Sequence, residues 1–169
     1  MAIAWAQAAN ASIGSRFDSA RVGTTFSGLL IFEHAYALTW VGDCRAFRIK
    51  GQTVELLTTD DTRLCEALGR PPTRLEVREG GDPARRLTKW LDGADRRDDY
   101  YNVVGGPIYG DEIFVLASDG LWTEVEPEAL LSLMAAERLQ DAVDALVQQA
   151  WALDPTDDIT CAAVRLRVT

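Results

Sequence analysis

The chain has 169 residues, of which 47% are apolar and 25% charged, as in one ordinary globular domain rather than a disordered or fibrous chain. Asp and Glu outnumber Lys and Arg by 26 to 17, so the net charge is −9 at pH 7. Such a surface repels phosphate backbones and anionic membranes, which excludes nucleic-acid binding through a broad basic face. No linker or repeat divides the sequence, and we expect a single domain over residues 1–169.

The cysteines and the N-terminal segment indicate the compartment. Cys44, Cys65 and Cys161 are odd in number and widely separated, unlike the cysteines of a disulfide scaffold or a CxxC zinc site. Residues 1–15 lack the basic start of a signal peptide, and the longest apolar run, residues 26–32, is too short to cross a bilayer. We therefore expect a cytoplasmic protein that is not anchored in a membrane.

The first third of the chain predicts one helix followed by short strands. Apolar residues recur at helical spacing over residues 1–10, and Gly14 predicts the end of that helix. Apolar runs separated by turns then predict four strands, at residues 24–32, 36–41, 45–49 and 54–57. Because the connections between them are tight, we expect an antiparallel meander.

Residues 58–102 are richer in charge, proline and glycine, so we expect mainly loops there. One short helix is predicted over residues 61–68, with Gly69 as its end. The basic residues of this stretch lie among aspartates, and we expect them to be neutralised locally on a solvated face. This basic cluster consists of Arg85, Arg86, Lys89, Arg96 and Arg97.

The C-terminal part predicts strands around two helices. An apolar strand is expected at residues 113–117, followed by helices over residues 127–134 and 139–150, the second with one buried face. The last strand is predicted from Val164, Leu166 and Val168, which alternate with arginines as in a strand with one face in water.

The candidate functional groups are acidic. The single histidine, His34, falls in a predicted turn, and no serine lies in a GxSxG motif, which excludes a Ser-His-Asp hydrolase. Asp43, Asp119 and Asp157 each adjoin a predicted strand, and carboxylates at strand ends can converge on one edge of a sheet. Oxygen ligands of this kind suit Mg²⁺ and Mn²⁺. Asp-Gly and Asp-Asp are also common in turns and loops, so the spacing of these aspartates alone does not exclude a purely structural role.

The order of six short segments resembles the metal-dependent protein serine/threonine phosphatases, the PPM or protein phosphatase 2C-type family, in its bacterial form. The segments are residues 23–25, 41–47, 56–61, 86–88, 110–122 and 157–160. The resemblance covers nearly all of this chain but only the C-terminal portion of the family's domain. It implies an α+β fold, an N-terminally truncated α-β-β-α sandwich of antiparallel sheets flanked by helices.

The resemblance also implies a metal centre of Mn²⁺ or Mg²⁺ at the rim of the sandwich, where water attacks a phosphoserine or phosphothreonine. Asp119 and Asp157 look like ligands of the catalytic ions, and Asp43 with Asp119 resembles a pair that holds an additional ion in some bacterial relatives. Gly120 and Asp158 are implied as supporting residues, although the family commonly has Asn at position 158. Residues 62–91 correspond to the flap beside the family's active site.

The chain departs from the family at its N-terminal end. The family's first strands carry an arginine that grips phosphate, a Glu-Asp pair and an Asp-Gly, and no segment before Gly23 supplies them; Arg16 and Asp18 lack that context. Three hypotheses follow: a phosphoprotein phosphatase, a catalytically silent truncated module that binds phosphoproteins or a partner, and a structural cation site in an unrelated β-sandwich. The missing strands could also come from a second chain, another copy included, or from a lost upstream segment.

Overall fold

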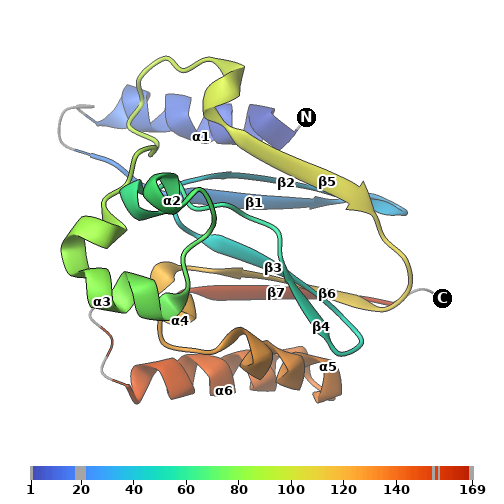
Figure 1. Cartoon of the computed structure of the whole chain (residues 1–169). Coiled ribbons are helices and arrows are strands. Elements are labelled where there is room, and N and C mark those ends of the chain that lie inside the picture. Colours follow the sequence, from blue (N-terminus) through green and yellow to red (C-terminus); the bar gives the residue numbers. More distant parts are fainter. Residues whose placement is uncertain (1, 18–21, 154, 156, 168–169) are drawn as a thin grey trace.

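Figure 1 shows the computed structural model of the chain, which describes residues 2–17, 22–153, 155 and 157–167. The helical elements are α1 (Ala2–Arg16), α2 (Arg63–Leu68), α3 (Arg74–Arg85), η1 (Asp98–Tyr100), α4 (Asp119–Trp122), η2 (Pro127–Leu131), α5 (Ser132–Ala135) and α6 (Leu139–Trp151). The strands are β1 (Phe26–Ile31), β2 (Ala35–Val41), β3 (Arg45–Lys50), β4 (Thr53–Leu56), β5 (Asn102–Pro107), β6 (Glu112–Ala117) and β7 (Cys161–Leu166).

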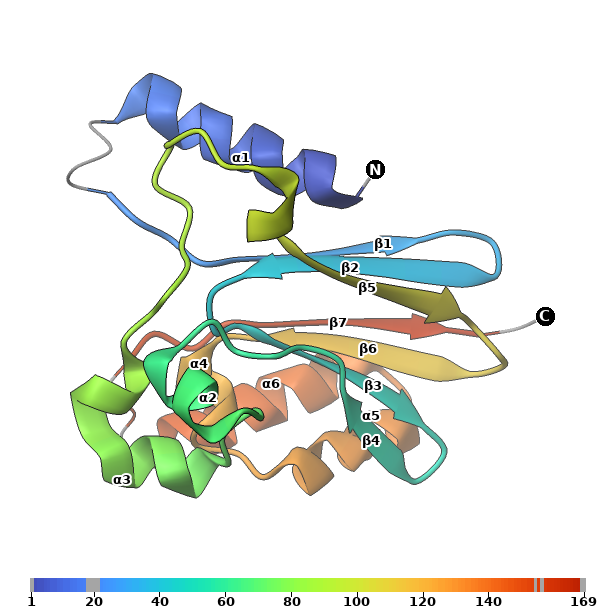
Figure 2. The ribbon, with the colours of Figure 1, turned by 45° about the horizontal axis from the view of Figure 1, so that its top comes forward.

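The strands form two antiparallel sheets that lie face to face between layers of helix (Figure 1, Figure 2). One sheet has the strand order β1-β2-β5 and is covered by α1; the other has the order β4-β3-β6-β7 and is covered by α5 and α6. The helices α2 and α3 lie at one end of the sandwich. This α-β-β-α arrangement confirms the predicted fold class.

The core lies in three layers that follow from the alternation of side chains along the strands. Leu38 and Trp40 of β2 face the second sheet, where they pack near Phe114 of β6. The other face of the first sheet meets α1, where Val41 packs in one cluster with Ala6. Burial of each large apolar side chain contributes about 1.5–3 kcal/mol, so both sheets are held on both faces.

The meander predicted for residues 24–57 is wrong at one connection. β1–β2 and β3–β4 are antiparallel hairpins, but β2 pairs on its other side with β5, whereas β3 pairs with β6. Gly42, between β2 and β3, has a φ of +106°, and a Cβ there would lie 2.4 Å from the methyl group of Thr25. Only glycine fits this turn, through which the chain passes from one sheet to the other.

One helix is longer than predicted, and another helix was not predicted. α1 continues through Gly14, because this glycine serves a close contact rather than a helix end: a Cβ there would lie 2.7 Å from the carbonyl oxygen of Gly93. α3 occupies a stretch predicted as loop. It begins with a capping box formed by Thr73 and Glu76, and it is kinked at Gly81, which has a φ of +58°.

Two strands also differ from expectation. β5 has no counterpart among the predicted strands, since two glycines and a proline end its short sequence. β7 is present, but Val164 is 36% exposed, whereas Arg165 is half-buried and donates hydrogen bonds to the carbonyl oxygens of Leu133 and Ala136. The face of β7 that was predicted to be exposed to solvent thus carries an arginine that binds the end of α5. Val168 lies outside the described residues.

Other predictions are confirmed. α2 is capped by the Thr62 side chain and ends at Gly69, whose φ is +66°, and α6 buries Val143, Leu146 and Ala150. His34 is exposed in the turn between β1 and β2. None of the described helices is long and apolar enough to cross a membrane.

Candidate metal centre

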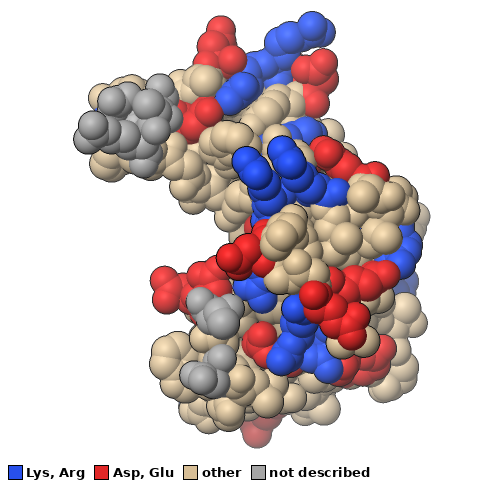
Figure 3. All heavy atoms as spheres, turned by 60° about the vertical axis from the view of Figure 1, so that its left-hand side comes forward, with Lys and Arg blue, Asp and Glu red and all other residues tan. Residues whose placement is uncertain are grey.

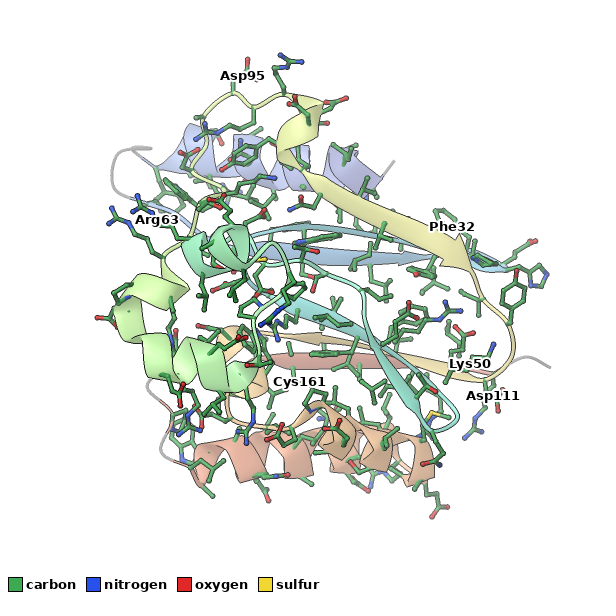
Figure 4. The ribbon with its side chains drawn as sticks, viewed as in Figure 1. Phe32, Lys50, Arg63, Asp95, Asp111 and Cys161 are labelled. Atoms are coloured by element: carbon green, nitrogen blue, oxygen red, sulfur yellow. The ribbon has the colours of Figure 1, made fainter. Side chains whose placement is uncertain are left out.

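The three aspartates that the resemblance implies as metal ligands are brought to one edge of the four-stranded sheet by its register. The first residue of β3 pairs with the last residue of β6, which pairs in turn with the first residue of β7. Asp43 lies just before β3, Asp119 just after β6, and Asp157 shortly before β7. These three strand ends are level, so the flanking carboxylates share one edge, which we call the acidic edge. Figure 4 labels Cys161, the first residue of β7, at this edge.

Hydrogen bonds from Ser118 to main-chain oxygens bring the segment that carries Asp119 beside the segment that carries Asp157. The hydroxyl group of Ser118 donates a hydrogen bond of 3.2 Å to the carbonyl oxygen of Asp158. The next contact explains the Asp-Gly dipeptide, because a Cβ at Gly120 would lie only 2.4 Å from that same oxygen. Gly120 and Asp158 therefore lie against each other through their main chain at the acidic edge.

Asp43 is held at the edge by hydrogen bonds on both sides of its turn. The amide of Gly42 donates to Asp61 Oδ2 at 2.9 Å, and the carbonyl oxygen of Asp43 accepts a 3.0 Å hydrogen bond from the indole nitrogen of Trp122. Trp122 belongs to α4, the helix that begins with Asp119. The turn before β3 is thus tied to the helix after β6.

The carboxyl groups of the acidic edge affect one another electrostatically. Burial raises the pKa of Asp43 to about 7, and the negative charges of Asp119, Asp60 and Asp157 add to this rise. Burial and the charge of Asp157 likewise raise the pKa of Asp119, while the positive charge of Arg85 opposes the rise. Burial is the main cause of both shifts, and the negative charges of the neighbouring carboxylates add to it.

The sequence pattern did not reveal two further groups at this edge. Arg85, at the end of α3, places its guanidinium nitrogen Nη1 3.8 Å from Asp119 Oδ2. Asp60 lines a narrow pocket together with Asp43, Arg85 and Asp119. Its carboxylate is bound by Arg45, which donates hydrogen bonds of 3.0 and 2.8 Å to the two oxygens. Segment 56–61 belongs to the resemblance, yet no spacing rule marks Asp60 as the partner of Arg45.

The aspartates suit a divalent cation in chemistry and charge, but they do not form a complete site. Among the described residues, no three His, Cys, Asp or Glu side chains lie close enough together to hold a metal ion. Burial raises the pKa of the nearby Cys161 thiol to about 11, so this thiol stays protonated near pH 7. The edge therefore offers hard oxygen donors, part of a ligand shell, and the assignment of Asp43, Asp119 and Asp157 as ligands stays a prediction.

Comparison with known proteins places this geometry in context. No protein-family profile matches the chain. A protein of Mycoplasma genitalium, itself described as a proposed protein phosphatase, is 25% identical over 155 residues, which cover 90% of this chain and 59% of the relative. The chain thus spans less than two thirds of that relative's length.

Solved structures of bacterial phosphatases match more closely in shape. The serine/threonine phosphatase PstP of Mycobacterium tuberculosis superposes with a TM-score of 0.79 at 19% identity, over 94% of this chain and 68% of that chain. The catalytic domain of PstP in complex with two manganese ions gives a TM-score of 0.77 at 19% identity, over 98% and 72% of the two chains. At such identities the likeness concerns the fold, and it confirms the resemblance found in the sequence: the chain has the fold of the PPM-type serine/threonine phosphatases.

Proposed function

We propose that this chain is a phosphatase module that hydrolyses phosphoserine or phosphothreonine in proteins with the help of Mn²⁺ or Mg²⁺. The observation that carries this proposal is the acidic edge, where register and main-chain contacts bring Asp43, Asp119 and Asp157 together within a PPM-type fold. The manganese ions of the PstP catalytic domain support the choice of metal. The free thiols of Cys44, Cys65 and Cys161 support a reducing compartment, the cytoplasm.

In this proposal each residue of the edge has a definite role. Asp119 and Asp157 hold the catalytic cation, and Asp43 with Asp119 holds a further one. A bound divalent cation supplies a more acidic water and neutralises the charge of the phosphate. Trp122 fixes the position of the Asp43 turn, and Gly120 allows the close approach of the two segments.

A second candidate function is a catalytically silent module that binds phosphoproteins. Two observations favour it: the guanidinium of Arg85 lies 3.8 Å from Asp119, where it offsets part of the negative charge, and the described residues contain no three-ligand group. An arginine that neutralises a carboxylate weakens its attraction for a metal ion.

Calorimetric titration with Mn²⁺ and hydrolysis of a phosphoserine peptide test the two candidates together. For the phosphatase, we expect Mn²⁺ binding and Mn²⁺-dependent release of phosphate, both of which Asp119→Asn abolishes. The matched control is Asp99→Asn, which removes the same charge from an exposed residue away from the edge. Hydrolysis that survives Asp119→Asn contradicts the ligand assignment. Absence of hydrolysis with every metal, at normal folding, favours the silent module.

A further inference from the structure

Two arginines occupy opposite positions in a short antiparallel main-chain pairing near the acidic edge. The main chain around Thr62 pairs antiparallel with the main chain around Leu87, and the amide of Arg63 donates a 3.0 Å hydrogen bond to the carbonyl oxygen of Arg86. This register sets Arg63 directly across from Arg86. Like charges in opposite positions of a strand pair are unfavourable, so the arrangement costs free energy unless an anion lies between the two groups.

Within the described part of the chain, neither guanidinium group has a hydrogen-bond or ion-pair partner. Part of the basic cluster behaves as the sequence predicts, since Arg96 pairs with Asp92 and Arg97 with Asp99. Arg85 and Lys89 are paired as well, but with Asp119 and Asp61, which are distant in the sequence. Arg86 therefore lacks the ion pair that the other members of the basic cluster have. Arg63, opposite Arg86 in the main-chain pairing, lacks one as well. In a chain with a net charge of −9, two arginines that line the same pockets and lack an ion-pair partner among the described residues are unexpected.

Both arginines line two neighbouring pockets. The larger, of about 770 Å³, is also lined by Thr88 and by Trp90, whose side chain is partly exposed. The buried hydroxyl oxygen of Thr88 has no hydrogen-bond partner among the described residues. A buried hydroxyl without a partner is costly, and an oxygen atom of a ligand would supply one if the side chain turned toward the pocket.

The charges around the second pocket connect the pair to the acidic edge. This pocket is lined by Arg63 and Arg86 together with Arg85, the residue that approaches Asp119. Glu66 lines the first pocket and Asp82 the second, so the two pockets together have three arginines against two carboxylates. Figure 3 shows Lys and Arg side chains meeting Asp and Glu side chains where this face is hollowed, and Figure 4 shows the side chain of Arg63 directed outward at the start of α2.

From this geometry we propose that Arg63 and Arg86 bind the phosphate group of a phosphoserine or phosphothreonine segment. The proposal rests on the proposed function, since it names the place where the phosphoprotein is recognised. Planar guanidinium groups bind phosphate oxygens through paired, charge-assisted hydrogen bonds, and an anion between them removes the repulsion within the pair. Trp90 adds an apolar surface for the peptide that carries the phosphate.

Binding is tested without metal, so that it does not depend on catalysis. The full chain is titrated calorimetrically, in buffer with EDTA at low salt, with a phosphoserine peptide of otherwise uncharged residues, with the same peptide unphosphorylated, and with inorganic phosphate. The double variant Arg63→Gln/Arg86→Gln is compared with Arg97→Gln/Arg138→Gln. The control removes two positive charges from side chains that are 89% and 75% exposed elsewhere on the surface.

We expect the wild type to bind the phosphopeptide more tightly than the unphosphorylated peptide, and the first double variant to lose at least about tenfold in affinity, while the control stays within about twofold. Urea unfolding verifies that both variants are folded. The proposal is overturned if the wild type does not distinguish the two peptides, or if both double variants bind alike. Inorganic phosphate that binds as tightly as the phosphopeptide overturns the assignment to a protein substrate. Failure of Mn²⁺-dependent hydrolysis contradicts the proposed function but leaves this binding site intact.

Discussion

The two ends of strand β6 carry acidic side chains in opposite electrostatic situations. At its start, Glu112 is fully buried, yet both its oxygens accept 2.8 Å hydrogen bonds from Arg48, and the amide of Tyr109 donates to it as well. Burial alone would raise the pKa of Glu112, but these hydrogen bonds and the positive charges of Arg48 and Lys50 lower it below its ordinary value. At the other end, the pKa of Asp119 is raised.

The two ends of β6 show how structural carboxylates differ from candidate functional ones. Glu112 has cationic and main-chain donors for both of its oxygens and needs nothing from outside the chain. Asp119 has one ion-pair partner among the described residues, Arg85 at 3.8 Å, and shares its edge with Asp43 and Asp157. A carboxylate whose negative charge is neutralised by donors of its own protein stabilises the fold. Carboxylates that repel one another instead attract an external cation.

Removal of the Glu112 carboxylate should change stability more than any other substitution considered below. Glu112→Ala leaves Arg48 beside a cavity without its partner, and we expect it to lower the free energy of unfolding by about 3 kcal/mol. Urea denaturation measures this loss. The control Asp99→Ala breaks an exposed ion pair with Arg97 and should cost less than about 0.5 kcal/mol. Equal losses for the two variants would show that Glu112 is not the structural carboxylate of this comparison.

The next effect comes from forcing apart the segments at the other end. A methyl group at position 120 would press on the main chain of Asp158, so Gly120→Ala is expected to cost about 2 kcal/mol. Gly106→Ala is the matched control, because its Cβ would meet only the ring of Tyr36 at 3.5 Å, an ordinary contact. Urea denaturation of both variants measures the difference. If the two substitutions are equally tolerated, then the close approach of the segments that carry Asp119 and Asp157 is not required.

The acidic edge could be predicted because it depends mainly on local signals. The strands beside Asp43 and Asp119 are recognisable from apolar runs, and their predicted ends agree with the structure to within one residue. The strand after Asp157 was recognised from its alternating pattern, but it begins at Cys161, three residues before the first residue of that pattern. Once β3, β6 and β7 are neighbours, residues just outside their level ends must meet. The capping box at Thr73 and Glu76 was a further local signal, by which α3 could have been found among the glycines and prolines.

The remainder of the site depends on contacts between distant segments, which no spacing encodes. Arg45 and Asp60, and likewise Arg85 and Asp119, are partners only because particular strands and helices lie side by side. The sequence equally fails to show that the chain passes from one sheet to the other at Gly42. A glycine in a simple hairpin would have the same neighbours in sequence. Pairing of this kind is set by the packing of the whole domain rather than by local propensity.

Removing a charge from the acidic edge should raise the free energy of unfolding, whereas removing Glu112 lowers it. In metal-free protein at pH 8, Asp43→Asn removes a desolvated carboxylate from beside Asp119 and is expected to stabilise the fold by about 1 kcal/mol. Asp158→Asn, an equal change at an exposed side chain in the segment before β7, should have almost no effect. Urea denaturation in EDTA measures both variants. A destabilised Asp43→Asn would mean that this edge is compensated like Glu112.

The smallest effect is the pH dependence of the compensated end. Because the folded-state pKa of Glu112 lies below its unfolded value, the unfolded chain binds more protons in this range, and the stabilisation by Glu112 is present above pH 4.5 and lost as pH falls through the folded pKa. The stability difference between wild type and Glu112→Gln should therefore shrink by up to about 1 kcal/mol from pH 7 to pH 3. Urea denaturation across this range measures it, with Glu33→Gln, at an exposed turn, as control. If this stability difference instead grows as the pH falls, the folded-state pKa of Glu112 is raised rather than lowered. Glu112 would then resemble the carboxylates of the acidic edge.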